Sequence, residues 1–152
     1  LKPGDIGYDP NVLHGLIAAP SDQEKKLKYG CYQKHTRGAQ GTKISTGNNN
    51  TRDVKNGCFD SKTAAKTLYK LKLNGYDDWY LPSKDELNQL FLNKDAIGGF
   101  VGINDYNNGL DFFYLSSSEK NNNTSWCQDF IFGAQLEFSK KKVYRVRAVR
   151  SF

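Results

Sequence analysis

Residues 74–87 read NGYDDWYLPSKDEL and constrain the local structure more tightly than any other part of the chain. Ser83 and Glu86 have the spacing of a capping box, in which each side chain bonds to the other residue's free backbone N–H. A helix is therefore predicted to begin after Ser83. Its large apolar side chains are expected to face inward: Leu87, Leu90 and Phe91.

A second helix is predicted just before this stretch. Asp60 or Ser61 can cap its N-terminus, and it runs to about Leu73. The dipeptide Asn74-Gly75 then supplies the left-handed backbone that ends a helix. Between these ends, apolar side chains recur at helical spacing: Ala64, Leu68 and Leu71.

Strands are predicted on both sides of the two helices. Residues 12–19 form an apolar run stopped by Pro20 and are predicted to be a buried strand with a break at Gly15. Residues 21–57 hold few large apolar side chains and are predicted to be a long loop region. After residue 94, aromatic-rich runs alternate with turns and predict four strands: Phe112–Leu115, Ser125–Phe132, Gln135–Ser139 and Val143–Phe152. Two central helices among antiparallel strands and long loops predict an α+β fold.

The size of the chain fits one domain. It has 152 residues, without an internal repeat or a linker, so residues 1–152 are predicted to form a single domain. No apolar run is long enough to cross a membrane. The chain contains no methionine and starts Leu1-Lys2-Pro3-Gly4, so we expect it to be a piece of a longer protein whose targeting segment lies elsewhere.

The positive charge is concentrated in the first half. The formal net charge is +6, and residues 1–76 carry 13 Lys/Arg against 6 Asp/Glu, while residues 77–152 carry 9 against 10. A localised positive surface favours polyanions such as nucleic acid, anionic lipid or sulfated polysaccharide. Charge alone does not choose among these partners.

Two short basic patterns resemble those associated with heparin-like glycosaminoglycans. A row of cations can neutralise several sulfates of a stiff chain at once and release their counterions. The alternative is an ordinary solvated face, and on a strand successive lysines point to opposite sides. The predicted contacts are the two clusters and three scattered cations: Lys25, Lys26, Lys28, Lys140, Lys141, Lys142, Lys34, Arg37 and Lys43.

Alternation along the C-terminal strand places Arg145 and Arg147 on one face together with valines. At least one of these arginines is expected to be partly buried, and a buried arginine needs a carboxylate partner. The candidate partners are Asp77, Asp78 and Glu119.

Neither a metal site nor a catalytic group is predicted. The three cysteines, Cys31, Cys58 and Cys127, fit no zinc pattern; they allow one disulfide plus one free thiol or three reduced thiols, and the pairing stays open. The Asn-rich loop 104–111 lacks calcium-ligand spacing. Ser116-Ser117-Ser118 has no nucleophile motif and is expected to tie the sheet to a neighbouring loop.

Several blocks together resemble the bacterial Lcl C-terminal domain family, which is named after the Legionella collagen-like adhesin. The resemblance spans residues 12–152, and Leu115 departs from it because the family commonly has Trp there. It is carried by four blocks and one tryptophan: HGLIAAPSDQ at 14–23, NGYDDWYLPSKDEL at 74–87, LSSSE at 115–119, Trp126, and RVRAVR at 145–150.

The resemblance implies a C-type-lectin-like fold and a non-enzymatic adhesin domain at the bacterial cell surface. It also implies a collagen-like stalk preceding the domain, a homotrimer, and binding of sulfated glycosaminoglycans of the host surface. No cofactor, no nucleic-acid partner and no membrane insertion are expected.

Two other functions remain open. A distant likeness to formylglycine-generating proteins suggests a cysteine-dependent enzyme, for which Cys127 beside Trp126 is a loose candidate. Nucleic-acid binding is less favoured because the aromatic residues fall mainly in strands that need them for a core.

Overall fold

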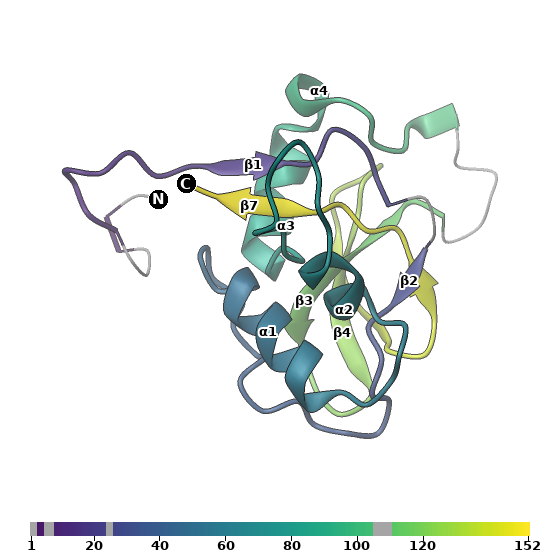
Figure 1. Cartoon of the computed structure of the whole chain (residues 1–152). Coiled ribbons are helices and arrows are strands. Elements are labelled where there is room, and N and C mark those ends of the chain that lie inside the picture. Colours follow the sequence, from purple (N-terminus) through teal and green to yellow (C-terminus); the bar gives the residue numbers. More distant parts are fainter. Residues whose placement is uncertain (1–2, 5–7, 24–25, 105–110) are drawn as a thin grey trace.

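A three-stranded antiparallel sheet lies at the centre of the computed structural model, which describes residues 3–4, 8–23, 26–104 and 111–152 (Figure 1). Its strands are β3 (Phe113–Glu119), β4 (Thr124–Asp129) and β5 (Gln135–Ser139), in that order. Every residue of β3 is buried, because helices α1 (Gly47–Gly57) and α3 (Lys84–Leu92) both contact this strand.

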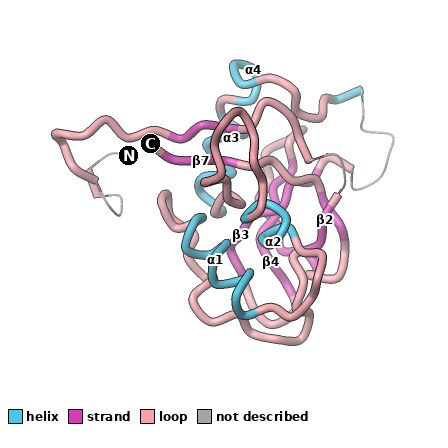
Figure 2. The backbone as a smooth tube through the Cα atoms, viewed as in Figure 1, coloured by secondary structure: helices cyan, strands magenta, loops and turns pink. Residues whose placement is uncertain are grey.

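Two short sheets tie the beginning of the chain to its end. β1 (Leu16–Ala18) pairs antiparallel with β7 (Val149–Ser151), and β2 (Leu27–Lys28) pairs antiparallel with β6 (Val143–Tyr144). The remaining helices are α2 (Ala64–Tyr69) and α4 (Lys94–Ile97), and long loops join the short elements (Figure 2). The predicted α+β fold is confirmed, whereas the C-type-lectin-like architecture stays a prediction.

Helix α3 begins as its sequence predicts. The Ser83 hydroxyl accepts a hydrogen bond from the Glu86 N–H at 3.3 Å, and the Glu86 carboxylate accepts one from the Ser83 N–H at 2.8 Å. Leu87 and Leu90 are buried and Phe91 packs beside them, which confirms the inward face.

Helix α2 is shorter than predicted at both ends. Its cap is Thr63, whose hydroxyl accepts the Lys66 N–H at 3.2 Å, not Asp60 or Ser61. The helix ends at Tyr69, because Asn74 and Gly75 form the tip of a tight turn, with φ of 53° and 81°. Leu73 and Tyr76 exchange two backbone hydrogen bonds across that turn.

Helix α1 lies inside the region predicted to be a long loop, so that prediction is wrong for residues 47–57. Its buried residues have helical spacing, but only one of them is a large hydrophobe: Gly47, Asn50, Thr51 and Val54. Asn50 donates to the Gly41 carbonyl at 2.6 Å, and Thr51 donates to the Leu81 carbonyl at 3.2 Å. A buried face satisfied by hydrogen bonds gives no apolar periodicity in the sequence.

The predicted strands exist, with different lengths. The run at residues 12–19 contains only the three-residue strand β1, and its predicted burial is wrong, because Val12, Leu13 and Ile17 are exposed. β3 continues to Glu119, well past Leu115. β4 ends at Asp129, where the Asp129 carboxylate accepts the Ile131 and Phe132 N–H groups in a turn. The predicted strand Val143–Phe152 is divided into β6 and β7.

Two apolar clusters fill the interior. The larger includes Leu68, Trp79 and Leu115, and the smaller is built around Tyr114 and Phe130. In the part of the chain that the structure describes, no helix combines the length and hydrophobicity that crossing a membrane requires.

Candidate functional site

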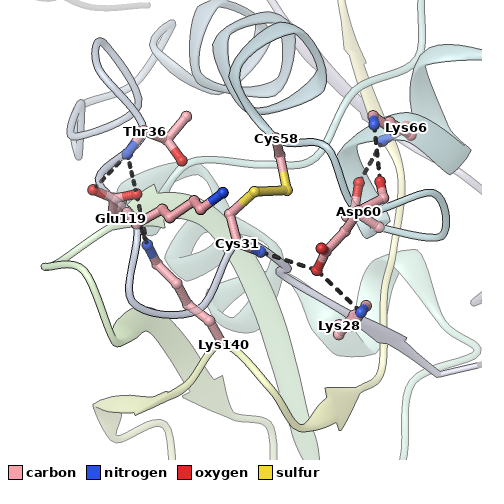
Figure 3. Close-up of a disulfide and its surroundings, with 10 residues drawn as sticks. Lys28, Cys31, Thr36, Cys58, Asp60, Lys66, Glu119 and Lys140 are labelled. Carbon is pink, nitrogen blue, oxygen red and sulfur yellow. Dashed lines mark hydrogen bonds and ion pairs between the residues drawn. A yellow bond between two sulfur atoms is a disulfide. The ribbon is translucent and has the colours of Figure 1, made fainter.

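One disulfide joins the loop after β2 to the end of α1 (Figure 3). It links Cys31 to Cys58, whose Cα atoms are 5.5 Å apart, and Cys127 is a buried free thiol. The arrangement of one disulfide and one free thiol is one of the two alternatives that the sequence left open. The bond fixes the loop that carries Lys34 and Arg37 to the body of the domain.

The turn leading into this loop has an uncommon backbone. Gly30, Cys31 and Gln33 have φ values of 93°, 51° and 66°. These values lie in the left-handed region that residues other than glycine seldom adopt. The Asp60 carboxylate holds the turn by accepting the Cys31 N–H at 3.1 Å. Lys28 lies 3.0 Å from the same carboxylate and, with the Cys31 N–H, lowers the pKa of Asp60.

A buried carboxylate, Glu119 at the end of β3, anchors the same loop from its other side (Figure 3). It lies 2.7 Å from the Lys140 ammonium and 2.6 Å from His35 Nδ1, and it accepts the Thr36 N–H at 2.9 Å. The loop, the central sheet and the turn after β5 therefore meet at one charged group. Burial lowers the pKa of Lys140, while Glu119 acts to raise it.

Lys140 is thus a correction to the predicted ligand contacts. Its side chain is 0% exposed and also donates to the Lys34 carbonyl at 3.0 Å, so a sulfate cannot reach it. A sulfate that approached Lys140 would also have to lose its hydration next to the buried Glu119 carboxylate, which already neutralises the ammonium group. Lys140 therefore has a structural role, because it holds the loop of Lys34 through that carbonyl.

The first basic cluster is partly neutralised. Lys26 pairs with Asp111, Lys28 pairs with Asp60, and both ammonium-bearing side chains are about two-fifths exposed, at 42% and 37%. Lys25 lies outside the described residues. The two described lysines of this cluster, Lys26 and Lys28, are therefore paired with carboxylates and are not free cations.

The other predicted cations are exposed and form no ion pair with any described residue: Lys34, Arg37, Lys43, Lys141 and Lys142. Four of them, Lys34, Arg37, Lys141 and Lys142, lie on the loop and the turn that Glu119 ties together, and we call these four residues the cationic surface. Lys43 lies apart, where its carbonyl accepts the Ser83 hydroxyl at 2.9 Å.

Two aromatic residues border the cationic surface. Lys34 Nζ is 5.7 Å from the centre of the Phe59 ring, and Lys141 Nζ is 4.1 Å from the centre of the Tyr32 ring. Neither ring was predicted from the sequence to be part of a site. A signal was present, because each aromatic residue directly follows one of the two disulfide cysteines.

The predicted burial of a C-terminal arginine is confirmed, but its predicted partner is wrong. Arg147 is fully buried and lies 2.7 Å from Asp22, which also pairs with Arg145 at 3.3 Å. Asp78 instead pairs with Arg150 at 2.7 Å. Alternation along a strand predicted the burial, whereas Asp22 is more than a hundred residues away in the chain.

The hydroxyls of the serine run are structural, as expected. Ser116 donates to the Trp126 carbonyl at 2.7 Å, and Ser118 donates to the Gly41 carbonyl at 2.6 Å. They tie β3 to β4 and to the loop before α1. Most of the Asn-rich loop considered for calcium, residues 105–110, lies outside the described residues.

The described residues bring together one group of potential metal ligands: Cys31, Cys58 and Asp60. Its two sulfurs are bonded to each other, which removes the thiolates that a metal would need. Cys127 has no partner cysteine, and burial raises the pKa of its thiol. A reactive cysteine pair that includes Cys127 is therefore ruled out.

Two open depressions lie away from the cationic surface. One, of about 410 Å³, is lined by Asn48, Tyr69, Lys70, Lys72, Asp77, Asp78 and Trp79. The other, of about 490 Å³, is lined by Ser21, Asp22, Gln23, Leu27, Lys62, Thr67, Leu71 and Leu73. Neither lining contains a cysteine or a histidine.

The chain was compared with models of known families. The model described as the Lcl C-terminal domain matches residues 21–150 of the 152-residue chain. A search of curated proteins finds no significant match.

Proposed function

Because the chain belongs to the Lcl C-terminal domain family, we propose that it is the ligand-binding domain of a bacterial surface adhesin. In this function the domain binds sulfated glycosaminoglycans of a host surface and performs no chemistry on them. The family, together with the basic composition, favours this function over a cysteine-dependent enzyme.

The observation that carries the proposal is the cationic surface. Lys34, Arg37, Lys141 and Lys142 are exposed and form no ion pair within the described residues. Their charges are therefore available to an external anion. Each contact with a sulfate releases a counterion, so affinity rises with the number of contacts and falls with salt.

The loop that carries Lys34 and Arg37 is held to the rest of the domain at several points, which favours binding. The disulfide, the Asp60 carboxylate and the Glu119 carboxylate all hold the loop that carries Lys34 and Arg37. Binding then needs to order only side chains and not the loop, which lowers its entropic cost.

A homotrimer is part of the proposal. A collagen-like stalk preceding the domain would bring three copies together. Weak single sites become useful in such an assembly, because the second and third contacts are intramolecular.

The experiment compares two charge-matched variants for retention on heparin in a salt gradient. The first changes the cationic surface: Lys34→Ala, Arg37→Ala, Lys141→Ala and Lys142→Ala. The control removes four exposed cations elsewhere: Arg52→Ala, Lys62→Ala, Lys70→Ala and Lys72→Ala.

We expect the first variant to elute at much lower salt, with the slope of log K against log[salt] reduced by about 3 to 4 for four lost contacts. The control is expected to shift slightly, through net charge alone. Equal shifts for both variants, or unchanged retention of the first, would refute the assigned surface. Competition by desulfated heparin and by DNA at matched salt separates a sulfated sugar from any polyanion.

A further inference from the structure

Phe59 is exposed to an unusual degree for a large apolar side chain. It is 86% exposed, although it directly follows Cys58, which is buried. Its ring therefore contributes little to the core, and solvating it costs free energy. Single exposed apolar side chains are common on protein surfaces, so the significance of Phe59 depends on the groups around its ring.

The disulfide brings two aromatic residues into one region. Tyr32 and Phe59 each follow one of its cysteines, whose Cα atoms are 5.5 Å apart. The left-handed φ values of Cys31 and Gln33, 51° and 66°, flank Tyr32 directly. Uncommon backbone conformations of this kind cost free energy and persist where the surrounding structure imposes them, often at functional sites.

Two cations of the cationic surface lie against these rings. Lys34 is over Phe59 and Lys141 is over Tyr32, while the buried Lys140 holds the Lys34 carbonyl at 3.0 Å. The neighbouring carboxylate, Asp60, is engaged by Lys28 and the Cys31 N–H, so it is already neutralised. The region is therefore apolar and positive at the same time.

A sulfated sugar has the complementary chemistry. The face of a pyranose ring carries C–H groups, which pack on the electron-rich face of an aromatic ring, while sulfates project from the ring edge. Lysine ammonium groups held beside the aromatic ring can then reach those sulfates. A polyanion without rings can use the lysines but gains nothing from Phe59.

We infer that Phe59, Lys34 and Lys141 form a subsite that stacks one sugar ring of the polysaccharide and binds its sulfate groups. This inference rests on the proposed function and adds to it a residue that recognises the sugar and not the charge. Tyr32 acts as a positioning residue for Lys141.

The test measures the affinity of Phe59→Ala for three probes at one salt concentration: heparin, inorganic polyphosphate and a single-stranded oligonucleotide. Polyphosphate has charge without rings. We expect a loss of about fivefold for heparin, in the range measured for single aromatic contacts, and no change for polyphosphate. Phe59→Trp should keep the heparin affinity.

Phe132→Ala is the matched control, because Phe132 is also highly exposed, at 68%, but lies in the turn between β4 and β5. It should leave all three affinities unchanged. Equal losses for heparin and polyphosphate, or no loss for heparin, would overturn the subsite while leaving the four-cation result intact. A larger loss for the oligonucleotide than for heparin would assign the ring to base stacking and overturn the sugar assignment.

Discussion

Glu119→Gln should be among the most destabilising single substitutions of a charged residue in this domain. The substitution keeps the size of the side chain and removes its charge. Both members of the Glu119–Lys140 pair are 0% exposed, and their charged atoms are 2.7 Å apart. Without the carboxylate, the Lys140 ammonium keeps the Lys34 carbonyl, at 3.0 Å, as its hydrogen-bond acceptor.

The magnitude follows from this burial. Removing one partner of a buried ion pair costs about 3–5 kcal/mol, because the other charge is left uncompensated. The His35 contact adds little, since the His35 side chain is 53% exposed and such contacts contribute at most about 1 kcal/mol. In Glu119→Gln/Lys140→Met no ammonium is left buried, so the cost should fall to about 1–2 kcal/mol, the scale of the lost hydrogen bonds.

Urea unfolding of the wild type, Glu119→Gln, Lys140→Met and the double variant gives the four free energies of unfolding that a double-mutant cycle needs. Glu137→Gln is the control, because Glu137 forms an exposed pair with Lys120 at 3.5 Å and should cost at most about 1 kcal/mol. The reasoning fails if Glu119→Gln costs no more than Glu137→Gln, or if the double variant is as unstable as Glu119→Gln. Amide exchange at Thr36 should accelerate in Glu119→Gln, since that N–H donates to the carboxylate.

Three further substitutions or conditions test other parts of the structure. Cys31→Ser/Cys58→Ser opens a 27-residue loop and should lower the free energy of unfolding by about 3.5 kcal/mol on the loop-entropy model, measured by urea unfolding. Gly47→Ala should cost several kcal/mol in the same assay, because its Cβ would lie 2.7 Å from the Ser83 backbone nitrogen. Asp60 and Asp78 have pKa values lowered from 3.8 by Lys28 and Arg150, so their contribution is present above that value and is lost as pH falls through the lowered pKa. Glu86 acts in the opposite direction, because burial raises its pKa from 4.5 and its contribution falls as pH rises from 4.5 through the raised pKa. Urea midpoints from about pH 6 to pH 2 should therefore decline less on the acid side in Asp60→Asn/Asp78→Asn than in the wild type.

The sequence was most informative where interacting groups are neighbours in the chain. Ser83 and Glu86 satisfy each other's N–H groups within one helical turn, so the start of α3 could be predicted without any tertiary contact. The Asn74-Gly75 turn was also recognisable, although its role was not. Both residues have positive φ, which ends a helix or closes a hairpin equally well, and the pairing of Leu73 with Tyr76 selects the hairpin.

The sequence predicted all four residues of the cationic surface among its ligand contacts. It could not separate them from the buried or paired lysines, because each support of the site joins distant segments. Lys140 is in a run of three lysines that looks like a solvated face, and only its proximity to Glu119 shows that it is buried. Cys31 and Cys58 could pair in more than one way with a third cysteine present. Helix α1 buries amides and hydroxyls, so it lacks the apolar repeat from which helices are recognised.

By itself, then, the amino-acid order determined the family, the α+β class, the capped helix and the excess of positive charge, since these depend on composition and on contacts within a few residues. The tertiary structure alone decided which cations face solvent, which carboxylates neutralise the others, and which rings stand beside them. The physical reason is that a charged side chain is available to a ligand or neutralised according to the groups within a few ångströms of it. For Lys140 and Arg147 those neighbours are 21 and 125 residues away along the chain.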